Sequence, residues 1–207
     1  GLVVCDCNRE LDAMRHHDAD DWRLLMSDEI HPNMDGHKRI AEQLAGSICG
    51  RRVTLAEVGP PQPAIPRTLS LLRADKPIRV LAMPPYDGLI EGLLRKLKPG
   101  TRVEVTSWPV EGQPLKKIEQ DAAKRVRPMK PDLVLIAVPR TAAAATAEEF
   151  INSYSWIMNY SLSFSHQQWD CVIIHPSVAD PDGGDSAHDA LVRRLVRAQD
   201  LHLVDRP

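Results

Sequence analysis

The sequence has no excess of charge of either sign and no long apolar run. Its 26 lysine and arginine residues nearly balance 28 aspartate and glutamate residues, which leaves a net charge of −2 at pH 7. A chain so balanced has no strong electrostatic attraction for nucleic acid or for an anionic membrane, so we expect neither as a partner. No stretch of 18 consecutive apolar residues occurs either, and we predict no transmembrane segment.

Cysteine is also scarce, with four residues at Cys5, Cys7, Cys49 and Cys171. Cys5 and Cys7 would share one face of a predicted strand, which favours buried thiols over a disulfide or a metal site. No second cysteine pair accompanies them, and the histidines and aspartates of 16–21 lack the spacing of a metal-binding motif. We therefore expect no metal site.

The length of 207 residues and the hydrophobic content of 43% allow a sizeable core in one or two domains. A proline-rich stretch at 59–66 cannot sustain a helix or a central strand and indicates a linker. We therefore divide the chain into an N-terminal part at 1–50, a linker at 51–75 and a larger domain at 76–207. The first part alone is too short for a comfortable core.

Short β-rich runs alternate with helical patterns through the larger domain. The runs lie at 78–82, 102–106, 132–138, 170–175 and 201–204, and the helical patterns at 88–98, 114–127, 146–166 and 187–199. Such alternation is typical of an α/β fold with a parallel sheet covered on both faces. The continuous apolar runs at 133–138 and 171–174 suit its central strands.

Aromatic residues make up only 4% of the chain, and most of them gather at 150–169. Phe150, Tyr154 and Phe164 recur at helical spacing, which favours a helix packed on the sheet. The alternative is a stacking platform for sugars or bases, and that function would require exposed rings.

One short motif has the composition of an acid–base site. Asp28 precedes His31 by three residues, so its carboxylate can reach the Nδ1–H of the imidazole and fix the tautomer. The other ring nitrogen, Nε2, is then open to take a proton from a nucleophile. Pro32 disfavours the α conformation at His31, and we therefore predict that the ring is presented on an extended turn.

A helix is predicted to follow this turn directly. Asn33 suits its N-cap, and Gly50 ends it. The apolar residues of the helix form one stripe, made of Ile40, Ala41, Leu44, Ala45 and Ile48. We expect residues 34–48 to dock on the sheet of 76–207 through this stripe, which would bring His31 toward the loop at 84–88.

The run Asp28-x-x-His31-Pro-Asn-x-x-Gly36-His37 resembles the last sequence block of the SGNH (GDSL-type) hydrolases. The resemblance implies serine-dependent hydrolysis of a small-molecule ester, with His31 as general base and later acid, Asp28 as its orienting partner, and no metal or organic cofactor. In this family a serine near the N-terminus is the nucleophile, and the block closes the domain. No residue before Asp28 matches that serine, so we expect the chain to be a fragment that begins inside one domain and lacks the nucleophile.

Residues 76–207 resemble the same fold a second time. The resemblance implies a flavodoxin-like three-layer sandwich with a parallel five-stranded sheet, preceded here by an N-terminal partial domain. The family's catalytic blocks are missing from it: residues 84–88 read Pro-Pro-Tyr-Asp-Gly in place of Gly-Asp-Ser, and residues 138–141 read Val-Pro-Arg-Thr in place of Gly-x-Asn-Asp. The resemblance therefore implies a degenerate domain, incomplete at its C-terminal end.

Two further features allow more than one interpretation. Gly112 matches the glycine of the family's second block, whose backbone N–H serves the oxyanion hole, and the alternative is an ordinary loop glycine. Asp185-x-x-His188 repeats the Asp–His spacing, but a helix and a strand still follow it. We therefore interpret Asp185 or Ser186 as a helix cap.

Two functions follow from these observations. The first is a serine ester hydrolase, favoured by the block at Asp28 and His31. The second is a noncatalytic binding or scaffolding domain, favoured by the missing serine and asparagine blocks in 76–207. Both functions are compatible within one protein.

Overall fold

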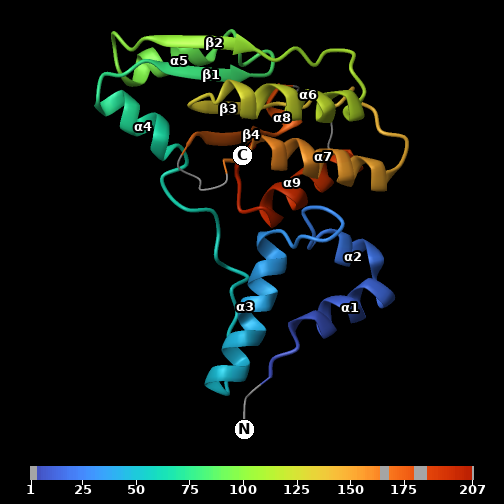
Figure 1. The fold of residues 1–207 in the computed structure, drawn as a ribbon. Coiled ribbons are helices and arrows are strands. Elements are labelled where there is room, and N and C mark those ends of the chain that lie inside the picture. The colour runs from blue at the N-terminus through green and yellow to red at the C-terminus, as the bar shows by residue number, and fades with distance from the viewer. Residues whose placement is uncertain (1–3, 164–167, 180–185, 207) are drawn as a thin grey trace.

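The larger domain is built on one parallel sheet. The computed structural model describes residues 4–163, 168–179 and 186–206. Its strands are β1 (Ile78–Ala82), β2 (Val103–Ser107), β3 (Leu133–Ile136), β4 (Asp170–Ile174) and β5 (His202–Val204). They are all parallel and lie in the order β2-β1-β3-β4-β5. Helices flank this sheet (Figure 1), which confirms the predicted flavodoxin-like three-layer α/β sandwich.

The helices of this sheet domain largely follow the predicted pattern. They are α4 (Pro66–Arg73), α5 (Ile90–Leu97), α6 (Leu115–Met129), α7 (Ala147–Ser161), α8 (Pro176–Ala179) and α9 (Ala187–Ala198). The patterns at 88–98, 114–127 and 187–199 predicted α5, α6 and α9 to within two residues at each end. Helix α7 ends at Ser161, and Phe164, which was expected to continue it, lies outside the described residues.

The centre of the core is strand β3. All four of its residues are buried, because β1 and β4 pair with it on either side and helices cover both faces of the sheet. Phe150 and Tyr154 of α7 are buried against the sheet, which confirms core packing for these rings and excludes them from a stacking platform. Trp156 and Tyr160 are only partly buried and stack on each other, with ring centroids 5.1 Å apart.

The parallel register places the carboxyl ends of the strands along one edge of the sheet. Ala82, the last residue of β1, pairs with Ser107 of β2 and Leu135 of β3, and Ile174 of β4 pairs with Val204 of β5. The loops that follow these strands therefore gather at this edge, where ligand sites form in open parallel sheets.

The residues before the sheet domain form a separate group of helices. Helices α1 (Cys7–His17), α2 (Ala19–Arg23) and α3 (Met34–Cys49) make up this helical segment, which lies beside α9 and away from β1 and β2 (Figure 1). Of the predicted linker at 51–75, the described stretch 51–65 forms no helix or strand, whereas α4 occupies most of the remainder. None of the helices in the described ranges is long and apolar enough to cross a membrane.

The strand predicted for the start of the chain is absent from its described part, Val4 and Cys5. A strand needs a neighbour for its hydrogen bonds, and no other strand lies beside these residues in the described chain. Cys7 instead begins α1, with Asp6 as the N-cap. The interpretation of Cys5 and Cys7 as buried thiols on one strand face was therefore wrong: both are partly exposed, and their Sγ atoms lie 3.4 Å apart.

The predicted docking of residues 34–48 is found only near the start of α3. Lys38 forms an ion pair with Asp200, at 2.6 Å between Nζ and Oδ1, but Leu44 and Ile48 remain 41% and 79% exposed. Figure 1 shows the reason, because α3 meets α9 with its first turns and then runs away from the sheet domain. The loop at 84–88 follows β1 near the opposite edge of the sheet, so the expectation that His31 approaches it was also wrong.

Helix α4 depends on a carboxylate of the sheet. It has no side-chain cap of its own, and the buried Asp170 at the start of β4 accepts hydrogen bonds from the backbone N–H groups of Arg67 (3.1 Å) and Thr68 (2.7 Å). This contact satisfies two of the N–H groups that a helix leaves unpaired at its first turn.

We predict that Asp170→Ala lowers the free energy of unfolding by about 1–3 kcal/mol, because two N–H groups lose a charged acceptor. Urea denaturation measures this change. The matched control is Glu91→Ala, which removes a half-exposed ion pair with Arg95 and should cost less than about 1 kcal/mol. Equal losses in the two variants would contradict this account of α4.

Candidate functional site

The residues from Met26 to Pro32 form a compact turn that carries the predicted acid–base pair. An antiparallel bridge joins Met26 to Pro32, and the N–H of Ser27 donates to the carbonyl of His31 at 2.8 Å. Within the turn the Asp28 carboxylate accepts the N–H groups of Ile30 (2.9 Å) and His31 (2.8 Å). One side chain thus fixes the backbone that presents His31.

The contact predicted between Asp28 and His31 is present. Nδ1 of the imidazole lies 2.8 Å from Oδ2 and 3.1 Å from Oδ1 of the carboxylate. The His31 side chain is 68% exposed, and its Nε2 has no hydrogen-bond partner among the described residues. Because the carboxylate accepts from Nδ1–H, Nε2 is left as the proton acceptor. His37 is exposed on α3 and takes no part in this pair.

The electrostatics of the turn keep Asp28 ionised. Partial burial raises the pKa of its carboxyl, but hydrogen bonds from the Ile30 N–H and from the ring and N–H of His31 outweigh this effect and lower the pKa below its usual value. A carboxylate that stays charged at neutral pH stabilises a protonated imidazole beside it.

Local packing explains two further residues of the motif. Asn33 caps α3 by accepting the N–H of Gly36 at 3.0 Å, and its own amide donates to the carbonyl of Leu24. A Cβ at Gly36 would lie 2.5 Å from the carbonyl oxygen of Leu25 and 2.8 Å from Cβ of Pro32. Glycine is therefore required where α3 begins against the turn.

Gly112 lies elsewhere. It occupies an exposed position between β2 and α6 with a φ of +68°, in the left-handed region that favours glycine. Gly112 follows β2, which is at the opposite edge of the sheet from β5. The helical segment that carries His31 lies beside α9 and away from β2 (Figure 1), so the structure does not bring Gly112 and His31 together.

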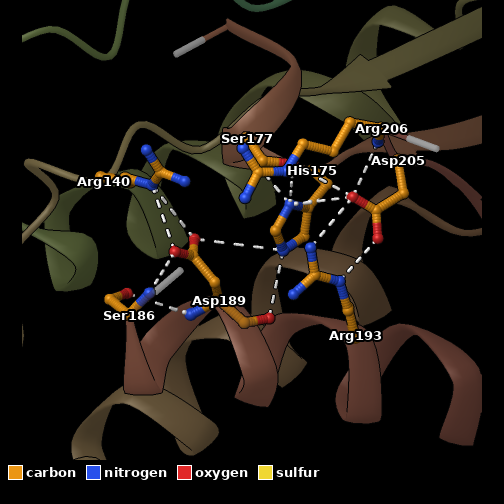
Figure 2. A network of polar contacts seen from close by, with 8 residues as sticks. All are labelled: Arg140, His175, Ser177, Ser186, Asp189, Arg193, Asp205 and Arg206. Carbon is orange, nitrogen blue, oxygen red and sulfur yellow. Dashed lines mark hydrogen bonds and ion pairs between the residues drawn. The ribbon is translucent and has the colours of Figure 1, made fainter. Parts of the chain in front are cut away.

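A second polar cluster, not found from the sequence, lies at the carboxyl edge of the sheet. Figure 2 shows its members, which come from the ends of three strands and from α8 and α9: Arg140, His175, Ser177, Ser186, Asp189, Arg193, Asp205 and Arg206. His175 directly follows β4, and Asp205 directly follows β5. Polar residues that directly follow parallel strands are the sequence signal that could have identified this cluster.

The cluster contains a serine, a histidine and an aspartate but not the geometry of a catalytic triad. Ser177 Oγ lies 2.6 Å and Asp205 Oδ1 3.3 Å from the same nitrogen, Nδ1 of His175. Nε2 of His175 instead lies 3.1 Å from the carbonyl oxygen of Asp189. A triad needs the nucleophile on one ring nitrogen and the carboxylate on the other. His175 and Ser177 are also completely buried, so no substrate can reach them.

The charges of the cluster are paired. Arg193 donates hydrogen bonds to Asp205, at 2.6 Å to Oδ2 and 3.2 Å to Oδ1. These bonds are the main reason that the pKa of Asp205 is lowered to about 2. Ser177, His175 and the N–H of Arg206 lower it further by smaller amounts. Burial raises the pKa of Asp189, which is 1% exposed, but hydrogen bonds from Ser186 and Arg140 outweigh this effect and lower the pKa overall. The cluster therefore joins α9 to the ends of β4 and β5 as a structural network.

The two segments that follow β1 and β3, residues 84–88 and 138–141, also form structural contacts. Asp87 accepts the hydroxyl of Ser107 at 2.6 Å, and Arg140 forms an ion pair with Asp189 at 3.2 Å. Ser186 caps α9 in a capping box with Asp189, as predicted for this residue, whereas Asp185 lies outside the described residues. The described ranges contain no group of three or more side chains that could hold a metal ion.

Comparison of the chain with models of protein families, with curated proteins and with solved structures found no match.

We predict that Gly36→Ala displaces the turn that carries His31. The added methyl group would overlap the Leu25 carbonyl, and overpacking of this kind costs about 1–3 kcal/mol. Hydrogen exchange at the Ile30 and His31 amides should become faster, because their acceptor is the Asp28 carboxylate. The control is Gly46→Ala on the same helix, where the only close atom is 3.8 Å away; it should leave these amides unchanged. Slow exchange in both variants would contradict the requirement for glycine at 36.

We predict that the Asp205 network loses its stabilising effect in acid. Because the folded pKa is depressed, the contribution is fully present above about pH 4 and is lost as the pH falls toward 2. Arg193→Gln should raise the pKa of Asp205 toward its usual value, as measured by carboxyl ¹³C NMR. Arg194→Gln, which alters an exposed ion pair with Asp21, should leave that titration unchanged. An Asp205 pKa that is the same with and without Arg193 would show that this pairing has been overestimated.

Proposed function

We propose that Asp28 and His31 form the acid–base half of a serine-dependent ester hydrolase whose substrate is a small-molecule ester. The observation that carries this proposal is the 2.8 Å contact between the Asp28 carboxylate and Nδ1 of His31, with Nε2 exposed and without a partner among the described residues. The resemblance of residues 28–37 to the last block of the SGNH hydrolases supports the same chemistry. In this proposal the serine comes from outside this chain.

The reaction follows from the two ring nitrogens. Nε2 of His31 accepts the proton of the serine hydroxyl as its oxygen bonds to the ester carbonyl carbon, and the charge of Asp28 stabilises the resulting imidazolium. His31 then donates that proton to the departing alcohol, which leaves an acyl-serine. Water repeats the sequence as the second nucleophile: His31 takes its proton and returns it to the serine oxygen as the acid is released.

A noncatalytic function is favoured for the sheet domain itself, because the side chains at the carboxyl edge of its sheet are buried or paired with one another. His175 and Ser177 are completely buried there, and Arg140 and Asp87 are engaged with Asp189 and Ser107. These contacts support a noncatalytic scaffolding domain that has kept the sheet without a catalytic site.

The isolated chain should not hydrolyse short-chain aryl esters such as p-nitrophenyl acetate above background. In a polypeptide that also carries the serine-bearing portion, His31→Ala should lower kcat by about 10³-fold or more, because the members of a triad act as a unit. The matched control is His37→Ala, six residues further along the same motif, which should leave kcat unchanged. An unchanged rate in His31→Ala would remove His31 from the mechanism. If the isolated chain hydrolysed the ester and phosphonylation of one of its serines abolished this activity, the assignment of the nucleophile would be wrong.

A further inference from the structure

We propose that Asn159 and Gln199 of the sheet domain are positioning residues for the turn that carries Asp28 and His31. The proposal rests on the proposed function, in which His31 is the general base. It gives the sheet domain a definite task, which is to hold an acid–base pair that lies outside its own sheet.

The contacts converge on Ser27, the residue next to Asp28. The side-chain amide of Asn159 donates to the Ser27 carbonyl oxygen at 3.0 Å, and the amide of Gln199 donates to the Ser27 hydroxyl oxygen at 3.0 Å. Gln199 also donates to Oδ1 of Asn159 at 3.3 Å, so the two amides fix each other. Both the backbone and the side chain of Ser27 are therefore held by the sheet domain.

A second contact holds the preceding residue. Arg23 donates from Nη1 to the Met26 carbonyl at 3.1 Å and from Nε to Oδ1 of Asn152 at 2.7 Å. Burial lowers the pKa of Arg23, while the charge of Asp28 acts in the opposite direction. Met26 and Ser27, the two residues that lead into Asp28, are thus both tied to α7.

The sequence of α7 explains why these amides face the turn. Asn152 and Asn159 are seven residues apart, which is two helical turns, so they lie on the same face of the helix. Ile157 and Met158, which lie between them, are completely buried in the hydrophobic core. Gln199 is the C-cap of α9 and only 7% exposed. The amides therefore occupy fixed places on two packed helices, as precise positioning of a site requires.

These contacts differ from the other links between the two parts of the chain. Lys38 with Asp200 and Arg194 with Asp21 are ion pairs that join the same parts without touching residues 26–31. The contacts at Ser27 are hydrogen bonds between neutral groups, so pH and salt should affect them little. Because a displacement of about 1 Å can reduce a catalytic rate by about 10²-fold, a fixed turn is a functional requirement for the base.

The test uses Asn159→Asp in the complete 207-residue chain. The variant keeps the size of the side chain and replaces the donating amide with a carboxylate oxygen that cannot donate to the Ser27 carbonyl. Faster hydrogen exchange at Ile30 and His31 is expected in this variant. Gln199→Ala, which adds no charge near Asp28, should also make this exchange faster, and it should raise the Asp28 pKa toward its usual value in ¹³C NMR titrations.

Arg194→Ala is the matched control, because it removes a contact between the same two parts of the chain and should change neither measurement. Unchanged exchange of the β3 amides would establish that the sheet is intact in each variant. If a variant does not fold, Ser27→Ala gives a milder test, since it removes only the acceptor of Gln199. Normal amide exchange in both Asn159→Asp and Gln199→Ala, with an unchanged Asp28 pKa in Gln199→Ala, would overturn the proposal.

The catalytic readout separates this proposal from the proposed function. In a polypeptide with the serine-bearing portion, Asn159→Asp should lower kcat by about 10–100-fold with KM nearly unchanged, as expected for a residue that orients another. If His31→Ala has no effect on the rate, the proposed function fails, yet hydrogen exchange still reports whether Asn159 holds the turn. If only Asn159→Asp is without effect on both exchange and rate, His31 remains the base and the positioning role is wrong.

Discussion

Burial of both faces of the central strand is the constraint on which the rest of the structure depends. Strand β3 is completely buried, and it can be so only because parallel strands flank it and helices cover both faces. This arrangement sends every strand toward the same edge, where His175 and Asp205 meet. It also packs α7 against α6 and α9, and Asn159 of α7 and the C-cap Gln199 of α9 lie on these packed helices.

Two of the histidine–aspartate pairs among the described residues have environments that give them opposite properties. At His31 the carboxylate binds one ring nitrogen, and the side chain is 68% exposed to solvent. At His175 both ring nitrogens are occupied and the ring is completely buried. Residue type alone therefore does not separate an exposed histidine–aspartate pair from a buried structural network; the burial of the ring and the partners of its two nitrogens do.

The helical segment shows how a part too small for its own core can still hold a defined turn. Leu44 and Ile48 remain exposed, so burial of the apolar stripe does not attach α3 to the sheet domain. Leu24, which follows α2, joins the hydrophobic core, and polar contacts add to this attachment through the Lys38 ion pair and the amides around Ser27. Hydrogen bonds are directional, and for this reason they fix the orientation of a turn better than apolar contact would.

The sequence by itself determined the features that depend on neighbours along the chain. Periodicity predicted α5, α6 and α9, apolar runs predicted β3 and β4, and the spacing of Asp28 and His31 before Pro32 predicted their contact. Contacts between distant residues decided the rest. The described part of the strand predicted at the start of the chain, Val4 and Cys5, has no strand beside it, and α3 meets the sheet domain only near Lys38. The cluster around His175 and the amides that hold Ser27 join residues from separate elements, and only tertiary structure brings such residues together.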